Sequence, residues 1–318
     1  MKALLIKLLA GLTAIAALQV PVGYLLRETD NYHYDRVQRA LAPRADALLL
    51  GDSVFGYNQG GDPVSLVQLL GKESPLPAAA FEGPGYGPEV QLAMLDYSLR
   101  QGYVPKVVVA SINLRAFGEF WDQGLQFQFS ELRARLAQGD VLALGLQRPM
   151  TSYQLYAIFE GFPRSEEAFQ DLPITREGRR LGTIRQILAR SHKRTTPEAR
   201  GLAFSLLYQY PLDPDHRKLR ALRDMAALCR SKNIPLRLYV TPIDVESGER
   251  TAGTAFRPRV AANIAVLRAA LADQGATVED WSALLPAEHF SYDEYPNEHL
   301  TGAGRRRLAD EVLRVIRR

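Results

Sequence analysis

In the segment Leu48-Leu49-Leu50-Gly51-Asp52-Ser53-Val54-Phe55-Gly56-Tyr57, a short apolar run passes directly into a Gly-Asp-Ser turn. An apolar run closed by turn residues predicts a buried β-strand. The carboxyl ends of parallel strands form the ligand-binding edge of an α/β sheet, so we expect Ser53 at that edge. Ser53 is therefore the first candidate nucleophile, although Asp-Ser after a strand is also a common turn and helix-cap pattern.

A serine nucleophile needs a base, and the chain offers five histidines: His33, His192, His216, His289 and His299. His299 stands out because it lies in a polar loop, residues 295–304, directly before an amphipathic segment that predicts a closing helix over 304–316. Thr301 is expected to cap that helix, which would fix the position of the loop. His299 is therefore the candidate base.

The Gly-Asp-Ser turn and the histidine before the last helix together resemble the SGNH/GDSL hydrolase superfamily over residues 45–318. Two segments between them fit the same pattern. Residues 81–87 (Phe-Glu-Gly-Pro-Gly-Tyr-Gly) resemble the glycine-bearing second block, and residues 106–113 resemble the third block, a strand that ends in an asparagine. The four blocks follow the family's order along the chain, which favours the resemblance over chance turn residues.

The resemblance implies an oxyanion hole beside the serine and histidine. In the family, the serine backbone N–H, a block-two glycine N–H and the block-three asparagine side chain hold the developing negative charge. Carried over to this chain, these donors are Ser53, Gly83 or Gly85, and Asn113. Taken singly, the glycines also suit turns that need positive φ, and the asparagine also suits the end of a strand.

The sequence departs from the family at the acid of the triad. The family usually has an aspartate three residues before the histidine, and Pro296 occupies that position here. Asp293 is the preferred substitute, because it follows the aromatic residue Phe290 closely, as the family's acid follows an aromatic. Glu298 is the alternative acid, and a dyad without an acid also stays open.

The N-terminus predicts a membrane anchor. Residues 8–26 form a run of 19 residues without a charge, preceded by Lys2 and Lys7. About 20 apolar residues span the hydrocarbon core of a bilayer. We expect an uncleaved anchor over residues 1–27 and a linker helix within 28–44. The alternatives are a cleaved signal peptide, with Ala14-Ile15-Ala16 as the small-x-small site, and a buried core helix; the apolar run past Ala16 favours the anchor.

The orientation of the anchor rests on charge and analogy. Lys2 and Lys7 favour a cytoplasmic N-terminus, whereas four arginines after the span oppose it: Arg27, Arg36, Arg39 and Arg44. Membrane-anchored relatives in the superfamily work outside the cytoplasm. By analogy, we expect a single span in a bacterial inner membrane and a periplasmic domain.

Composition fits one globular domain behind the anchor. Hydrophobic residues make up 47% of the 318 residues, and the net charge of +4 comes mostly from dispersed arginines. The sequence has no basic stripe interleaved with aromatics that would predict nucleic acid binding. Anionic headgroups or an acidic polysaccharide are therefore the more natural partners. The single cysteine, Cys229, lies on an apolar helix stripe and is expected in the core. The sequence contains no metal-ligand cluster and no phosphate loop, so it predicts no metal and no cofactor.

Strands and helices alternate as a parallel α/β fold requires. Strands are expected over 46–50, 78–81, 107–112, 236–240 and 277–281, and helices over 31–41, 89–101, 215–231, 259–273 and 304–316. The resemblance implies the same architecture: a flavodoxin-like, three-layer α/β/α fold with a parallel sheet.

The alternation fails between residues 114 and 210, which carry many aromatics and a basic segment, residues 176–200. A loop this long inside a compact domain is usually functional. We therefore expect a helical cap that begins beside Asn113; a peripheral helical pair that only covers the sheet is the alternative. The aromatics suit sugar rings or an acyl chain, and equally a core.

These features predict an acyl-enzyme on Ser53, with water as second nucleophile in an esterase and a sugar hydroxyl in an O-acyltransferase. The anchored chain resembles bacterial proteins that modify alginate, cellulose and teichoic acid beside a membrane-bound acyl exporter. An envelope polysaccharide or acyl ester is the expected substrate, with such an exporter as partner. The alternative, favoured by Pro296, is a catalytically silent module that binds glycan or scaffolds an envelope complex.

Overall fold

A computed structural model of the chain describes residues 2–57, 63–118, 121–122, 129, 132–133, 136–137, 197–292, 296 and 298–318. Within its helices, the side chains of residues 16, 19–32, 34 and 198–199 lie outside this description. Several predictions fall on residues that are not described. These are the acid Asp293 and most of the helical cap expected over residues 114–210.

Within the described residues, five strands form one parallel sheet in the order β2-β1-β3-β4-β5. They are β1 (Ala47–Gly51), β2 (Ala78–Glu82), β3 (Val107–Ile112), β4 (Leu236–Val240) and β5 (Thr277–Asp280). Every residue of β1 and β3 is buried, as expected for central strands of a parallel sheet covered on both faces. The order is that of flavodoxin, which confirms the predicted parallel-sheet α/β fold.

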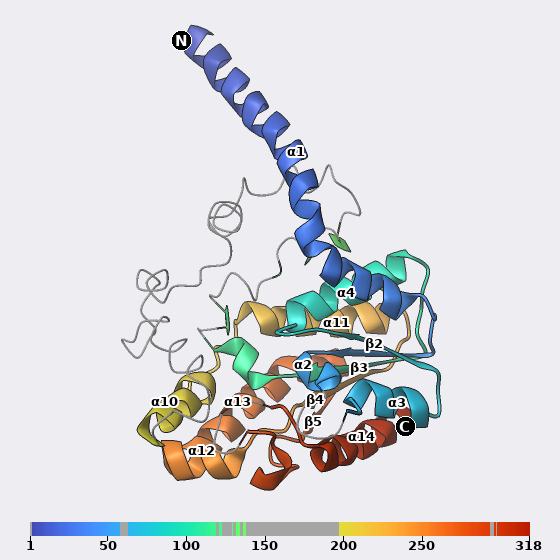
Figure 1. Cartoon of the computed structure of the whole chain (residues 1–318), viewed down its shortest axis with the longest axis vertical. Coiled ribbons are helices and arrows are strands. Elements are labelled where there is room, and N and C mark those ends of the chain that lie inside the picture. The colour runs from blue at the N-terminus through green and yellow to red at the C-terminus, as the bar shows by residue number, and fades with distance from the viewer. Residues whose placement is uncertain are drawn as a thin grey trace.

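Helices cover the two faces of the sheet, as Figure 1 shows for α4 and α11 on one side and α3 and α14 on the other. Leu48 and Leu50 of β1 point into the core beneath α4 (Pro88–Arg100), α11 (Arg217–Ser231) and α13 (Phe256–Leu271). Ala47 and Leu49 point the opposite way, into the core beneath α3 (Leu66–Glu73) and α14 (Gly302–Arg317). The alternation of strand side chains therefore builds the three predicted layers.

The predicted element boundaries are close to those observed, and the differences have local causes. Helix α13 begins at Phe256 instead of Arg259, because Pro258 is tolerated in the first turn of a helix. Thr301 caps α14, and its Oγ1 accepts a hydrogen bond from the Gly304 N–H at 3.3 Å. Helices α2 (Ser53–Gly56), α3 and α12 (Val245–Ala252) were not expected from the sequence.

The N-terminal helix α1 (Lys2–Leu41) is continuous, so the helix expected over residues 31–41 forms its last turns and ends at the predicted residue. Residues 27–41 contain no glycine or proline that would end a helix. Its last turns bury Val37, Ala40 and Leu41 in the domain core. Figure 1 shows its first half extending away from the domain. Among the described side chains, no helix combines the length and hydropathy of a membrane span.

Two described elements lie at the ends of the region expected to form the cap. The short helix η1 (Leu114–Phe117) follows β3 directly, and α10 (Pro197–Tyr208) leads back to the domain. Helix α10 packs closely on α12, since a Cβ added at Gly201 would lie 2.1 Å from the Thr251 carbonyl oxygen. Both ends of the region are thus fixed to the α/β domain.

Candidate active site

Ser53 lies at the carboxyl edge of the central strand β1, where the chain turns into α2. Asp52 caps this short helix, and its Oδ1 accepts a hydrogen bond from the Val54 N–H at 3.0 Å. Asp52 is 4% exposed, so the residue that caps the turn is buried, while Ser53 remains partly exposed. The Gly-Asp-Ser stretch therefore presents Ser53 at the edge of the sheet, as its sequence predicts.

The imidazole of His299 faces this serine. Its Nε2 lies 3.0 Å from the Ser53 Oγ, although 246 residues separate the two in sequence. Backbone contacts hold the loop that carries it: the His299 carbonyl accepts from the Ser291 N–H at 2.8 Å, and Leu300 forms a β-bridge with Phe290. This distance is the one required for proton transfer between a nucleophile and a general base.

Packing keeps the imidazole in its neutral form. The ring of His299 stacks on Tyr57, with ring centroids 3.9 Å apart and an interplanar angle of 14°. The Tyr57 hydroxyl in turn donates to the Tyr292 hydroxyl at 3.0 Å. Burial and, to a smaller extent, the positive charge of Arg115 lower the pKa of His299 to about 4. At neutral pH the ring can therefore accept a proton.

Asn113 lies at the carboxyl end of β3 and meets the Gly-Asp-Ser turn. Its Nδ2 donates to the Asp52 Oδ2 at 2.8 Å, and its Oδ1 accepts from the Arg115 N–H at 3.0 Å. An amide nitrogen carries two hydrogens, of which the bond to Asp52 engages one, and a side-chain hydrogen bond between Asn113 and Glu298 also lowers the pKa of Glu298. The asparagine expected in the oxyanion hole is thus joined to the residue directly before Ser53.

The block-two glycines lie at the neighbouring strand end. Gly51 pairs with Glu82 in the parallel register of β1 and β2, so Gly83 follows at the same edge as Asp52. Residues 83–86 form a turn closed by the Tyr86 N–H and the Gly83 carbonyl at 3.2 Å, with Gly85 at φ 79°. Proline second and glycine third are the residues of a type II turn. Gly85 is therefore required by the turn itself.

The alternative acid Glu298 is fully buried and has other partners. Its carboxylate accepts a hydrogen bond from the Tyr208 hydroxyl and lies 2.9 Å from Nη2 of Arg115. Burial raises the pKa of Glu298, and the Arg115 charge opposes that rise. The contacts described for this carboxylate join the histidine loop to η1 and α10, which is a structural role. The preferred acid Asp293 lies outside the described residues.

Three residues of this site were missed by the sequence analysis: Tyr57, Arg115 and Tyr208. Tyr57 closes the decisive Gly-Asp-Ser stretch and Arg115 follows Asn113 by two residues, so proximity in sequence could have indicated both. Tyr208 contributes from α10, 90 residues before its partner Glu298. No local pattern in the sequence marks such a contact.

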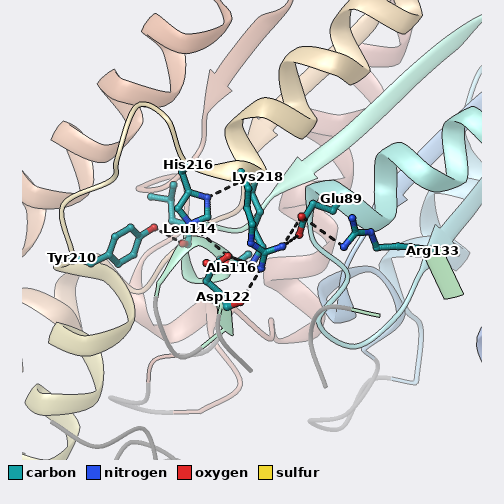
Figure 2. A network of polar contacts seen from close by, with 9 residues as sticks. Glu89, Leu114, Ala116, Asp122, Arg133, Tyr210, His216 and Lys218 are labelled. Atoms are coloured by element: carbon teal, nitrogen blue, oxygen red, sulfur yellow. Dashed lines mark hydrogen bonds and ion pairs between the residues drawn. The ribbon is translucent and has the colours of Figure 1, made fainter. Parts of the chain in front are cut away.

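A second polar network, drawn in Figure 2, fixes the segment that follows Asn113. The buried Lys218 donates to the Ala116 carbonyl and lies 3.2 Å from Asp122. The Arg217 guanidinium lies 2.8 Å from the carboxylate of the same Asp122 and 2.5 Å from that of Glu89 in α4. Helices α4 and α11 thereby hold the start of the region after β3. In the part of the chain that the structure describes, no group of three His, Cys, Asp or Glu side chains could hold a metal ion.

Comparison with known proteins finds no matching family model and no matching curated protein. Among solved structures, an α/β hydrolase enzyme from the metagenome of Lake Arreo, Spain, is similar at 13% identity and a TM-score of 0.39, over 86% of this chain and 94% of that one. A catalytic mutant of an acetylxylan esterase from Geobacillus stearothermophilus is similar at 13% identity and a TM-score of 0.40, over 85% and 93%. Similarity at this level assigns no function, so the proposal below rests on the site.

Proposed function

We propose that this chain is a serine esterase or O-acyltransferase of the SGNH/GDSL type. The observation that carries the proposal is the 3.0 Å contact between the Ser53 Oγ and the His299 Nε2 at the carboxyl edge of a parallel sheet. The two strands beside β1 lead into this edge: β3 is followed by Asn113, and β2 is followed by the turn of residues 83–86. The common strand edge of these residues supports an assignment of nucleophile, base and hydrogen-bond donors.

In this mechanism, the Ser53 Oγ attacks the carbonyl carbon of an ester while its proton moves to the His299 Nε2. The backbone N–H of Ser53, a block-two glycine N–H and the Asn113 amide are the proposed donors to the oxyanion. His299 then gives the proton to the leaving alcohol, which breaks the ester bond and leaves an acyl-serine. Water or a sugar hydroxyl, deprotonated by His299, releases the acyl group.

Asp293 is the proposed acid of the triad. Burial and Arg115 lower the pKa of His299, so the imidazolium formed during attack is disfavoured by its surroundings. A carboxylate at the other ring nitrogen would stabilise that charge and fix the tautomer, which is the role of the acid in a triad. A Ser–His dyad is the alternative.

An envelope glycan or its acyl ester is the proposed substrate, and a bacterial inner membrane with a periplasmic domain is the proposed setting. The first half of α1 supports attachment to lipid, because large apolar side chains there are more than half exposed: Leu4, Leu5, Ile6, Leu8, Leu9, Leu12, Ile15 and Leu18. Such surface is costly in water. A membrane-bound acyl exporter is the partner that an O-acyltransferase would need.

Covalent labelling tests the proposal. The full chain in detergent is treated with a fluorophosphonate probe, and the labelled residue is identified by mass spectrometry. We expect stoichiometric label on Ser53 and none in Ser53→Ala, with Ser282→Ala as a control that labels like the wild type. Turnover of acetyl esters should follow the label. Absence of both would favour the alternative, a silent module that binds glycan or scaffolds an envelope complex.

A further inference from the structure

We propose that His33 and Arg36 of α1 are positioning residues for the block-two turn, so that the N-terminal helix is part of the active-site architecture. The inference rests on the proposed function, because it assigns the turn of residues 83–86 to the oxyanion hole. Its structural basis is a pair of contacts from α1, one at each end of that turn.

The first contact runs from Arg36 to Glu82, the last residue of β2. Arg36 Nη1 donates to the Glu82 carboxylate at 2.7 Å and to the Glu82 backbone carbonyl at 2.8 Å. The two side chains are only 22% and 20% exposed, so water screens this pair less than an ordinary surface ion pair. Because Arg36 holds the backbone of Glu82, it also fixes the start of the turn at Gly83.

The Glu82 carboxylate also touches the helix that begins with Ser53. A Cβ added at Gly56 would lie 2.6 Å from the Glu82 Oε2, so this carboxylate lies directly against the end of α2. Burial raises the pKa of Glu82, the Arg36 charge lowers it and the Asp52 charge raises it slightly. Arg36 therefore holds in place a carboxylate that bridges α1, β2 and the nucleophile helix.

The second contact lies at the other end of the turn. The His33 Nδ1 is 2.5 Å from the Tyr86 hydroxyl oxygen. Tyr86 is 2% exposed, and its ring stacks on Phe81 with centroids 4.9 Å apart. The same ring covers Gly83, since a Cβ added there would lie 2.5 Å from Tyr86 Cε2. His33 thus fixes the ring that presses on the block-two glycine.

The two halves of the continuous helix α1 thus have different roles. Its first half carries the exposed apolar side chains, and its second half holds both ends of the block-two turn. The contacts described for His33 and Arg36 are with Tyr86 and Glu82, so we infer that each acts on the site through these residues. Loss of either contact should misplace the glycine N–H and slow the chemical step without weakening substrate binding.

The test uses the full chain in detergent and three variants: Arg36→Met, His33→Phe and Arg306→Met. The last is the matched control, because it removes an exposed Arg–Glu pair, Arg306 with Glu73 at 2.6 Å, on the other face of the sheet. We expect Arg36→Met and His33→Phe to lower kcat about tenfold or more with KM within twofold, and Arg36→Lys to recover part of the loss. The control should match the wild type.

Hydrogen–deuterium exchange of a peptide covering residues 82–87 gives a readout that does not depend on catalysis. Exchange there should become faster in Arg36→Met and His33→Phe, and stay unchanged in Arg306→Met. Unchanged exchange together with kcat within twofold of the wild type would overturn the inference. If the wild type neither labels at Ser53 nor turns over esters, the proposed function fails, and the exchange experiment alone still decides whether α1 holds the turn.

Discussion

The Glu298 carboxylate lies 2.9 Å from the Arg115 guanidinium, in a buried ion pair directly beside the proposed base. Glu298 has no exposed surface, and the Tyr208 hydroxyl donates to its other oxygen. Arg115 also donates to the Pro296 carbonyl at 3.3 Å and lies over the Trp121 ring. The loop that carries His299 is therefore attached to both described ends of the region after β3.

Glu298→Gln should destabilise the fold strongly. The amide can still accept from Tyr208, but it removes the buried carboxylate that neutralises Arg115, a loss that costs up to about 3–5 kcal/mol for a fully buried pair. Urea unfolding should show this drop in the free energy of unfolding. Glu279→Gln is the matched control, because it breaks an exposed pair with Arg318 and should change stability by less than about 1 kcal/mol. Equal losses in the two variants would contradict the structural role of Glu298.

Ser53→Ala and His299→Ala should each abolish acyl turnover and leave the fold intact. Both side chains are only partly buried, whereas loss of a nucleophile or its base costs several orders of magnitude in rate. Ester hydrolysis and thermal melting of the same preparations check both statements. Retention of more than about a tenth of the activity by either variant would refute the assignment.

The acid limb of the pH profile should lie unusually low. The base must be neutral to take the serine proton, and burial, with a smaller contribution from Arg115, holds the pKa of His299 at about 4. In a Ser–His dyad, kcat/KM should therefore fall only near pH 4 instead of near pH 6.5, whereas an acid at the other ring nitrogen would move the limb upward. Arg115→Met removes one cause of the shift and should move the limb upward. A wild-type limb near neutrality would instead indicate that a carboxylate such as Asp293 stabilises the imidazolium.

Tyr57 should support the base through its ring and not through its hydroxyl. Tyr57→Ala removes the surface on which His299 stacks at 3.9 Å, so the imidazole should lose its orientation and kcat should fall about tenfold to a hundredfold. Tyr57→Phe keeps the ring and should retain most of the activity. Steady-state kinetics of the two variants separate these roles, and equal losses would assign the effect to the hydroxyl.

Asp293→Asn should lower the rate by two orders of magnitude or more if Asp293 orients His299, because the wrong tautomer disables the base. Its stability should change little compared with that of Glu298→Gln. Rates and unfolding curves of the two variants should thus give opposite patterns. A neutral Asp293→Asn variant that still labels with fluorophosphonate would indicate a Ser–His dyad.

Most of the sheet could be predicted because its central strands, β1 and β3, are short runs of buried and mostly aliphatic residues. The bounds of Val107–Ile112 and Leu236–Val240 agree with the prediction to the residue. Helix α3 was missed although Ser65 and Gln68 form the capping box that its sequence spells out. Its eight residues make only about two turns, too few for apolar periodicity to stand out.

The candidate site likewise contains residues that the sequence predicted and residues that it did not. Ser53, Asn113 and His299 were predicted to lie together because each follows a strand or precedes a helix in a recognisable order. The pairs Arg115–Glu298 and Arg36–Glu82 join segments that are far apart in sequence and carry no motif. Charged residues are usually exposed, so the sequence alone gave no reason to expect a pair with a fully buried carboxylate, Arg115–Glu298, or a partly exposed pair, Arg36–Glu82.

If residues 8–26 span a bilayer, as we propose, the continuity of α1 would set the height of the proposed active site above it. An α-helix rises 1.5 Å per residue, so Arg36 lies about 15 Å along the helix axis from residue 26, the end of the expected span. With that span in the bilayer, a stiff helix instead of a flexible tether would hold the catalytic edge close to the lipid headgroups. Such an enzyme would reach polymer as it leaves the membrane and would not reach glycan deeper in the envelope. Inserting glycines after residue 32 would lengthen that reach and broaden the range of chains it can modify.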